Sequence, residues 1–311
     1  MAEPGAKQRI DEATGIETVG HEWDGIEELN NPLPRWWLLT FYASILFSLA
    51  YVIVYPAIPL LNRGTEGLWG WTSRGQLAAQ TKVAEGARAA TLARLAAAPL
   101  SQIAANPALF GAAKAGGKAA FRVNCVQCHG SEAAGGIGYP NLNDDDWLWG
   151  GNLDEIHATI VHGIRQPGDD RTRQAQTMPH FGRDGLLTQA EIGDAASYVR
   201  VLAGKDGAGP ASARGEALFA ANCAACHGAN GIGNREIGAP NLTDAVWLYG
   251  GSRAQIAATI TQGPAGVMPA WHARLDPVTI KMLAIYVHSL GGGEDFANAT
   301  PAQAGATHER P

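Results

Sequence analysis

The feature that most constrains the fold is an internal repeat in which both copies carry the same cysteine–histidine pattern. The C-x-x-C-H pattern occurs at Cys125, Cys128 and His129, and again at Cys223, Cys226 and His227. It is typical of covalent c-type haem attachment, in which both thiols form thioether bonds to the porphyrin. The chain has four cysteines, so none is left over for a structural disulfide. The sequence therefore predicts two covalently bound haem c groups.

The repeat extends well beyond these motifs. Residues 137–163 recur at 237–263 with matching Gly, Pro, Asn, Leu, Trp and Thr-Ile positions, and a Met-Pro pair follows each copy. Self-similarity of this kind indicates two copies of one structural unit. We expect one domain at residues 111–205 and a second at 206–292, joined by a Gly-rich stretch near residue 205.

One axial ligand of each haem iron is the histidine that ends the motif, His129 or His227. A ligating imidazole is neutral, and its other nitrogen needs a hydrogen-bond acceptor. The carbonyl groups of Pro140 and Pro240 are the candidates, because both lie in equivalent loops after the motifs.

The sixth iron ligand is predicted to be a methionine. Of the four methionines, Met178 and Met268 both precede proline at equivalent places, whereas Met1 is the start and Met282 lies in a helical pattern. A thioether ligand favours reduced iron and raises the redox potential. His162, His180 and His272 are the alternative donors, which we expect to be surface residues or outer partners. The pattern leaves open whether each methionine serves the haem of its own repeat or that of the other.

Each domain should begin with a helix that ends at the motif and finish with a helix that crosses it. Gly117 and Gly215 stand at equivalent places before the motifs, and Tyr198 and Tyr286 lie on the closing helices. A glycine on one helix lets an aromatic side chain of the other approach closely, so we expect both tyrosines to be core residues. The longer, charge-rich loop between Gly163 and Met178 is expected to face water.

A single membrane anchor is predicted near the N-terminus. No residue from Trp36 to Asn62 is charged, and Arg35 and Arg63 bracket the stretch. A spanning helix needs about 20 apolar residues, so we place it at residues 36–61. A cleaved signal peptide would need a short basic region and a nearby small-residue cleavage site. The preceding segment, residues 1–35, is long and acid-rich instead.

The remaining segments are assigned by composition. Residues 62–110 are Ala-rich and read as a helical spacer interrupted by Pro99 and Pro107, and residues 293–311 as a disordered tail. The net charge of −6 and the absence of a basic run exclude nucleic-acid binding.

Orientation does not follow from charge, because three basic residues precede the span and three follow it closely. Covalent haem attachment takes place on the extracytoplasmic face of the membrane. We therefore expect a single-pass protein of a bacterial inner membrane, with residues 1–35 cytoplasmic and both haem domains periplasmic.

The paired motifs with their trailing Met-Pro resemble class I cytochrome c domains in tandem over roughly residues 111–292. The segment from His21 to Trp37 resembles the start of the dihaem subunit, subunit III, of cbb3-type cytochrome c oxidases. The resemblance implies a mostly α-helical chain, with one transmembrane helix followed by two cytochrome c domains. It also implies a function: electrons from a donor cytochrome c pass to the monohaem subunit and the catalytic haem–copper subunit. The complex reduces oxygen and pumps protons, and this chain alone catalyses nothing.

Other functions share the same haem chemistry. A freestanding, membrane-anchored dihaem shuttle has the same haem chemistry and differs in lacking partner subunits. A cytochrome subunit of a dehydrogenase would still be only an electron carrier. A dihaem peroxidase needs a vacant sixth position, which two equivalent Met-Pro sites argue against.

Overall fold

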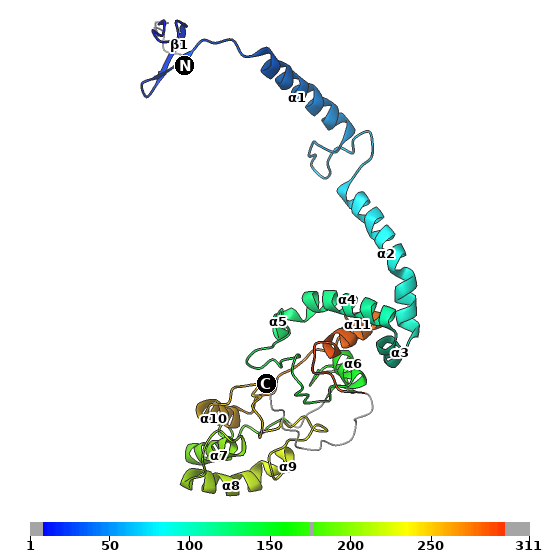
Figure 1. Cartoon of the computed structure of the whole chain (residues 1–311), viewed down its shortest axis with the longest axis vertical. Helices are drawn as coiled ribbons and strands as arrows, with labels where there is room; N and C mark the ends of the chain where they lie inside the picture. Colours follow the sequence, from blue (N-terminus) through cyan, green and yellow to red (C-terminus); the bar gives the residue numbers. More distant parts are fainter. Residues whose placement is uncertain (1–8, 174–176, 296–311) are drawn as a thin grey trace. The chain divides into compact units, whose positions relative to one another are not determined.

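The computed structural model describes residues 9–173 and 177–295, and within them the chain is mostly helical (Figure 1). The chain divides into two compact units, Met1–Ala87 and Arg88–Pro311. The mostly α-helical class with one apolar N-terminal helix confirms the prediction from the sequence.

The first unit begins with a β-hairpin that the sequence analysis did not predict. Strand β1 (Thr18–Trp23) pairs antiparallel with β2 (Ile26–Leu29). Asp24 and Gly25 form the turn, with φ of 51° and 86°. An Asp-Gly pair is the usual signal for a two-residue hairpin turn, because both positions need positive φ. The signal was therefore present in the sequence.

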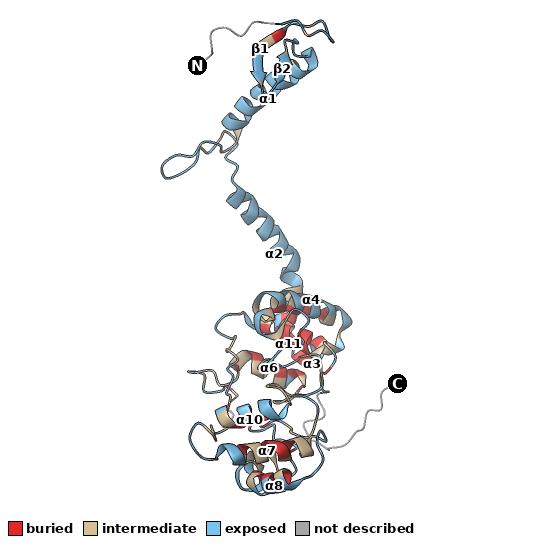
Figure 2. Cartoon of the chain, turned by 90° about the vertical axis from the view of Figure 1, so that its left-hand side faces the viewer, coloured by how far each residue is buried: buried red, intermediate tan, exposed pale blue. Residues whose placement is uncertain are grey.

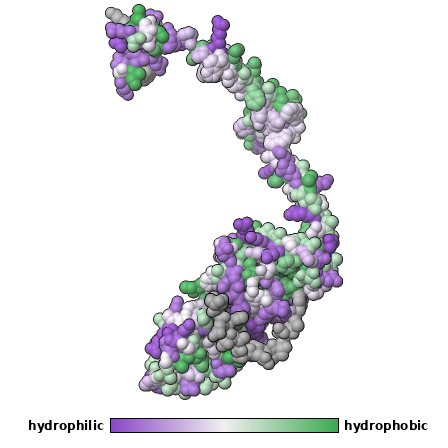
Figure 3. Space-filling model, in the orientation of Figure 1, coloured by the Kyte–Doolittle hydropathy of each residue, from purple (hydrophilic) through white to green (hydrophobic). Residues whose placement is uncertain are grey.

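Helix α1 (Arg35–Val54) is the one helix of the described residues that is long and apolar enough to cross a membrane. Its 20 residues span about 30 Å, the thickness of a hydrocarbon core. None of its residues is buried, and in Figure 2 α1 is almost entirely pale blue, the colour of exposed residues. Figure 3 shows green, hydrophobic residues along this part of the chain. The predicted span at 36–61 was too long: α1 ends before Pro56, because the residue preceding a proline is biased away from helical geometry.

Aromatic residues surround the C-terminal end of α1. Trp69 and Trp71 both make edge contacts with Tyr55, at ring-centroid distances of 5.2 and 5.7 Å. The Trp69 amide donates to the Val54 carbonyl, which would otherwise lack a partner at the helix end. Tryptophan and tyrosine are enriched where helices leave the hydrocarbon.

Helix α2 (Ser73–Ala97) and the short α3 (Leu100–Ala105) form the helical stretch expected between the span and the repeats. Of α2, only Leu95, near its C-terminal end, is buried. Leu95 joins a small core with Ile103 and Ile285. The Lys281 ammonium donates to the carbonyls of Leu95, Ala96 and Ala98 at 3.4, 2.9 and 2.8 Å, where a cation complements a helix C-terminus.

The second unit contains two similar groups of four helices. The first helical body consists of α4 (Pro107–Asn124), α5 (Val126–His129), α6 (Leu153–His162) and α11 (Pro277–His288). The second helical body consists of α8 (Pro210–Asn222), α9 (Ala224–His227), α10 (Arg253–Gln262) and α7 (Gln189–Leu202). Each has its own buried core, visible as separate red clusters in Figure 2.

The two bodies exchange their closing helices. Helix α11, from the second repeat, packs on α4 of the first, whereas α7, from the first repeat, packs on α8 of the second. We expected each closing helix to cross the motif helix of its own repeat, at residues 111–205 and 206–292, and the packing differs from this. Both interfaces use the same residue types, so the sequence pattern alone could not choose between them.

Two glycines show how closely the exchanged helices approach. A β-carbon built on Gly117 of α4 would lie 2.6 Å from the β-carbon of Tyr286. One built on Gly215 of α8 would lie 2.9 Å from that of Tyr198. The expected glycine–tyrosine approach is thus present, but each glycine meets the tyrosine of the other repeat.

The segment after α11 packs against the first helical body. The Trp147 indole donates to the Gly292 carbonyl, and the Gly151 amide donates to the Glu294 carboxylate at 2.8 Å. The tail predicted from residue 293 therefore begins with ordered contacts, and its part from residue 296 lies outside the described residues.

Candidate functional site

The first C-x-x-C-H motif occupies a single turn directly after α4. The His129 amide donates to the Cys125 carbonyl at 2.9 Å, and the Cys128 amide to the same oxygen at 3.1 Å. Gly130 ends the turn with φ of 78°. The turn therefore brings both thiols and the imidazole together at the end of one helix.

The second motif has the same geometry after α8. The His227 and Cys226 amides donate to the Cys223 carbonyl at 2.9 and 3.1 Å, and Gly228 has φ of 79°. Burial raises the pKa of the Cys125 and Cys223 thiols to about 11, so both are protonated at neutral pH until they are joined to a ligand.

The proline carbonyls predicted as histidine partners are confirmed. His129 Nδ1 lies 3.2 Å from the Pro140 carbonyl oxygen, and His227 Nδ1 lies 3.0 Å from that of Pro240. A carbonyl can only accept, so Nδ1 carries the proton and Nε2 keeps its lone pair for a metal. Burial lowers the pKa of both histidines, partly offset by these hydrogen bonds, which favours the neutral imidazole that a metal requires.

Each candidate methionine packs in the helical body that carries the haem motif of the other repeat. Met268 packs in the first helical body with Phe121 and Cys125. Met178 packs in the second helical body with Phe219 and Cys223. Each body thus brings together a thiol pair, an imidazole and a thioether.

Backbone contacts fix the exchanged position of both methionines. Met268 pairs with Ile164, just after α6, through two hydrogen bonds of 2.9 and 3.0 Å. A β-carbon on Gly163 would overlap the Met268 carbonyl, and one on Gly263 would overlap the Met178 carbonyl. Both glycines have positive φ, 68° and 53°, so a side chain would be strained there in any case.

Two buried indole groups fit a ligand that offers hydrogen-bond acceptors. The Nε1 atoms of Trp149 and Trp247 are buried and have no hydrogen-bond partner among the residues that the structure describes. A buried donor without an acceptor costs free energy, so such a group in a native protein needs an explanation. The carboxylates of a haem would supply acceptors. Neither tryptophan was assigned a role from the sequence, and the two do not stand at equivalent places of the repeat, since Tyr249 corresponds to Trp149.

The three alternative histidine donors each make a polar contact with an aspartate outside the haem motifs. His162 and His272 both contact Asp169, and His180 pairs with Asp184. The loop after Gly163 was expected to face water, but one of its arginines contacts the folded domain. Arg173 pairs with Glu155, and its guanidinium carbon lies 6.0 Å from the Trp149 ring centroid.

Comparison with known proteins supports these features. A family model described as "Cytochrome C oxidase, cbb3-type, subunit III" matches residues 112–199 and again 210–287. A second, described as the N-terminal domain of cytochrome oxidase-cbb3, FixP, matches residues 15–62. Together they include both motif repeats, α1 and the hairpin before it.

Similar proteins match nearly end to end. A cbb3-type cytochrome c oxidase subunit FixP of Azorhizobium caulinodans is 54% identical over 92% of this chain and 96% of its own length. The subunit CcoP of Cereibacter sphaeroides is 52% identical over 89% of this chain and 95% of its own. The subunit CcoP of Azospirillum brasilense is 47% identical, over 93% and 100%.

Proposed function

Because the chain belongs to the subunit III family of cbb3-type cytochrome c oxidases, we propose that each of its helical bodies holds a haem through ligands of both repeats. The chain is a membrane-anchored electron-transfer subunit of the oxidase and carries two haem c groups.

The first haem would be held by Cys125 and Cys128, with His129 and Met268 as the residues that bind its iron. The second would be held by Cys223 and Cys226, with His227 and Met178 in the same roles. This assignment rests on the packing of each methionine in the body that contains the motif of the other repeat.

The haems supply a one-electron redox change, and the chain sets its conditions. The proline carbonyls orient the two histidines through Nδ1 and leave Nε2 directed to the metal. As iron ligands, the two methionine thioethers would favour the reduced state and leave oxygen no position to bind. The residues therefore suit electron transfer, with oxygen reduction left to another subunit.

The ligand assignment can be tested in chains that keep one haem. With Cys125→Ser and Cys128→Ser, only the second haem remains. Met178→Leu should then abolish its methionine ligation, whereas Met268→Leu should not. The mirror pair, Cys223→Ser with Cys226→Ser, should give the reverse. Magnetic circular dichroism of the ferric protein reads the ligand. If each methionine instead serves its own repeat, both patterns invert.

For topology, we propose a cytoplasmic N-terminus and periplasmic helical bodies in a bacterial inner membrane. The motifs support this, because haem c is attached outside the cytoplasm. Alkaline phosphatase, which is active only in the periplasm, should be active when fused after Ala203 and inactive when fused after Asn30. Activity of the second fusion would contradict the proposed orientation.

For partners, we propose that the chain takes electrons from a donor cytochrome c and passes them through the monohaem subunit to the catalytic haem–copper subunit. The hairpin β1–β2 and the residues up to Arg35 are the candidate contact with these subunits. Replacing residues 21–35 by an unrelated polar segment should leave an anchored dihaem protein that no longer co-purifies with the oxidase. Full assembly and respiration of that chimera would support a plain anchor instead.

A further inference from the structure

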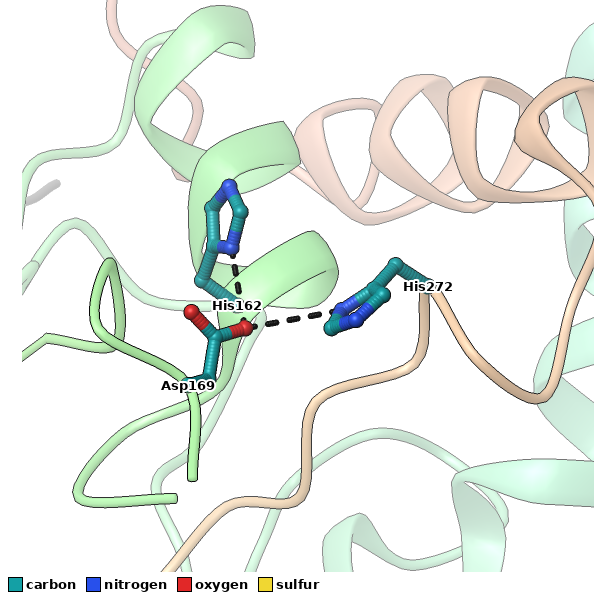
Figure 4. A group of neighbouring side chains, drawn as sticks. All are labelled: His162, Asp169 and His272. Carbon is teal, nitrogen blue, oxygen red and sulfur yellow. Dashed lines mark hydrogen bonds and ion pairs between the residues drawn. The ribbon is translucent and has the colours of Figure 1, made fainter. Parts of the chain in front are cut away.

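Three side chains capable of binding a metal converge at the junction between the repeats in the first helical body. His162 ends α6, Asp169 lies on the long loop that follows, and His272 comes from the segment after Met268 (Figure 4). One ligand atom of each lies within 4.8 Å of the other two. Within residues 9–173 and 177–295 no second group of three such side chains is found.

The carboxylate is held in place and directed at both imidazoles. Asp169 Oδ1 accepts from the Arg171 amide at 2.8 Å, which fixes the side chain within its own loop. Its Oδ2 lies 3.0 Å from His162 Nδ1 and 3.5 Å from His272 Nδ1. The His162 and Asp169 side chains are only 14% and 9% exposed, whereas His272 is 49% exposed, so the cluster is accessible from one side.

Both histidines are themselves held by their segments. The backbone amide of His272 donates to the Val161 carbonyl at 3.3 Å, and its Nδ1 lies 2.9 Å from the same oxygen. The His272 Nε2 atom is then the one with a free lone pair. His162 lies in the last turn of α6, and its Nδ1 contacts Asp169 Oδ2 at 3.0 Å.

We infer that His162, Asp169 and His272 form a binding site for one divalent transition-metal ion. Two imidazoles and one carboxylate are the donors that Zn²⁺, Cu²⁺ and Ni²⁺ accept, whereas Mg²⁺ and Ca²⁺ require oxygen ligands. Three protein ligands leave one position for water. Nitrogen and oxygen bind Zn²⁺ at about 2.0 to 2.2 Å, so ligand atoms around one ion lie roughly 3.4 Å apart. The three ligand atoms lie within 4.8 Å of one another, so binding would contract the cluster by about 1.4 Å at most.

The second helical body lacks this cluster although its backbone is equivalent. Gln262 stands where His162 does at the end of the helix, and Gly182 stands four residues after Met178 as His272 does after Met268. The loop that carries Asp169 also has no counterpart, because only four residues separate Gly263 from Met268. All three donors are therefore specific to one body.

Such an ion would add metal bonds between three segments that already meet through hydrogen bonds and packing. It would fasten the segment after Met268 to α6 and to the loop, and so stabilise the exchanged chain in the first helical body. The metal site does not depend on which methionine serves which haem, since its donors are not haem ligands.

The test uses the full-length, detergent-solubilised chain with both haems and Zn²⁺ as the probe. Isothermal titration calorimetry should show one Zn²⁺ bound per chain, and equal concentrations of Mg²⁺ or Ca²⁺ should not bind. Asp169→Asn, His162→Gln and His272→Gly should each weaken zinc binding at least roughly tenfold, the least that even outer partners of a metal contribute. The last two substitutions introduce residues that the second body already has.

The matched control is His180→Gln. His180 and Asp184 form another histidine–aspartate pair, 3.4 Å apart, but without a third ligand. This variant should bind zinc as the unchanged chain does. If any variant loses haem, the isosteric Asp169→Asn and the zinc X-ray absorption spectrum of the unchanged chain decide, with two imidazoles and one carboxylate expected. Absence of zinc binding, or binding that none of the three substitutions weakens, would overturn the inference.

Discussion

The two helical bodies share one arrangement down to individual contacts. Phe121 and Tyr286 in the first have ring centroids 5.4 Å apart at 58°, and Phe219 and Tyr198 in the second are 5.3 Å apart at 57°. The histidine–proline bonds and the glycine approaches are likewise duplicated. Both bodies thus keep the same surroundings for their C-x-x-C-H motif.

The differences lie around this common arrangement. Among the residues that the structure describes, only the first body carries the small core with α3 and the end of α2, the Lys281 contact to that helix end, and the His162–Asp169–His272 cluster. Three consecutive aspartates, residues 144–146, lie in the first repeat, and Val246 stands where Asp146 does. The first body thus packs against the end of α2 and against α3, whereas the second body makes no such contact among the described residues.

The largest expected effects come from filling the helix contact in either body. A β-carbon on Gly117 would overlap the Met282 carbonyl, and one on Gly215 would overlap that of Asp194. Alanine gains about 1 kcal/mol of helix propensity, yet overlap with backbone should outweigh this and lower the free energy of unfolding by roughly 1 to 3 kcal/mol net. Each substitution should also weaken methionine ligation at the haem of its own body.

Gly111→Ala is the control for Gly117→Ala, because Gly111 lies in the same helix and an added β-carbon meets nothing within 4 Å. It should leave stability equal or slightly higher. Chemical unfolding followed at the haem absorption measures both. If Gly117→Ala disturbed the second haem and spared the first, the equivalence of the exchanged bodies would be wrong.

A smaller effect is expected at Lys281, which distinguishes the bodies. Its counterpart in α7 is Gly193, so the second body makes no such contact. Lys281→Met keeps the helix propensity and the apolar stem but leaves three carbonyls without their donor. We expect a loss on the order of 1 kcal/mol and faster proteolysis after α2, while the second haem is unaffected. Unchanged proteolysis would mean that the small core alone holds α2.

The sequence predicted the repeat, the haem motifs, the proline partners and the anchor, because each follows from local spacing. It could not assign the closing helices, since Gly117 and Gly215 present the same surface to Tyr198 and Tyr286. Which closing helix packs on which motif helix depends on the path of the loop after Gly163. From its composition, this loop could be described only as charged. The Asp24-Gly25 turn was readable and was missed, and the end of α1 at Val54 followed from Pro56.

The smallest expected effect is electrostatic and again separates the bodies. Burial, with Asp244 and Asp144 nearby, raises the pKa of Asp146 to about 6, above the 3.8 of an ordinary aspartate. The folded state therefore binds this proton more tightly than the unfolded chain. It follows that the stabilising contribution is complete below about pH 4 and is lost as the pH rises through about 6.

Asp146→Asn should raise the free energy of unfolding at pH 7 by on the order of 1 kcal/mol after allowance for solvent screening, and change little at pH 4. Because Val246 occupies the equivalent position, the gain should appear in the unfolding of the first body and not the second. A pH-independent gain would show that the amide improves packing and that charge at Asp146 has no part in the difference.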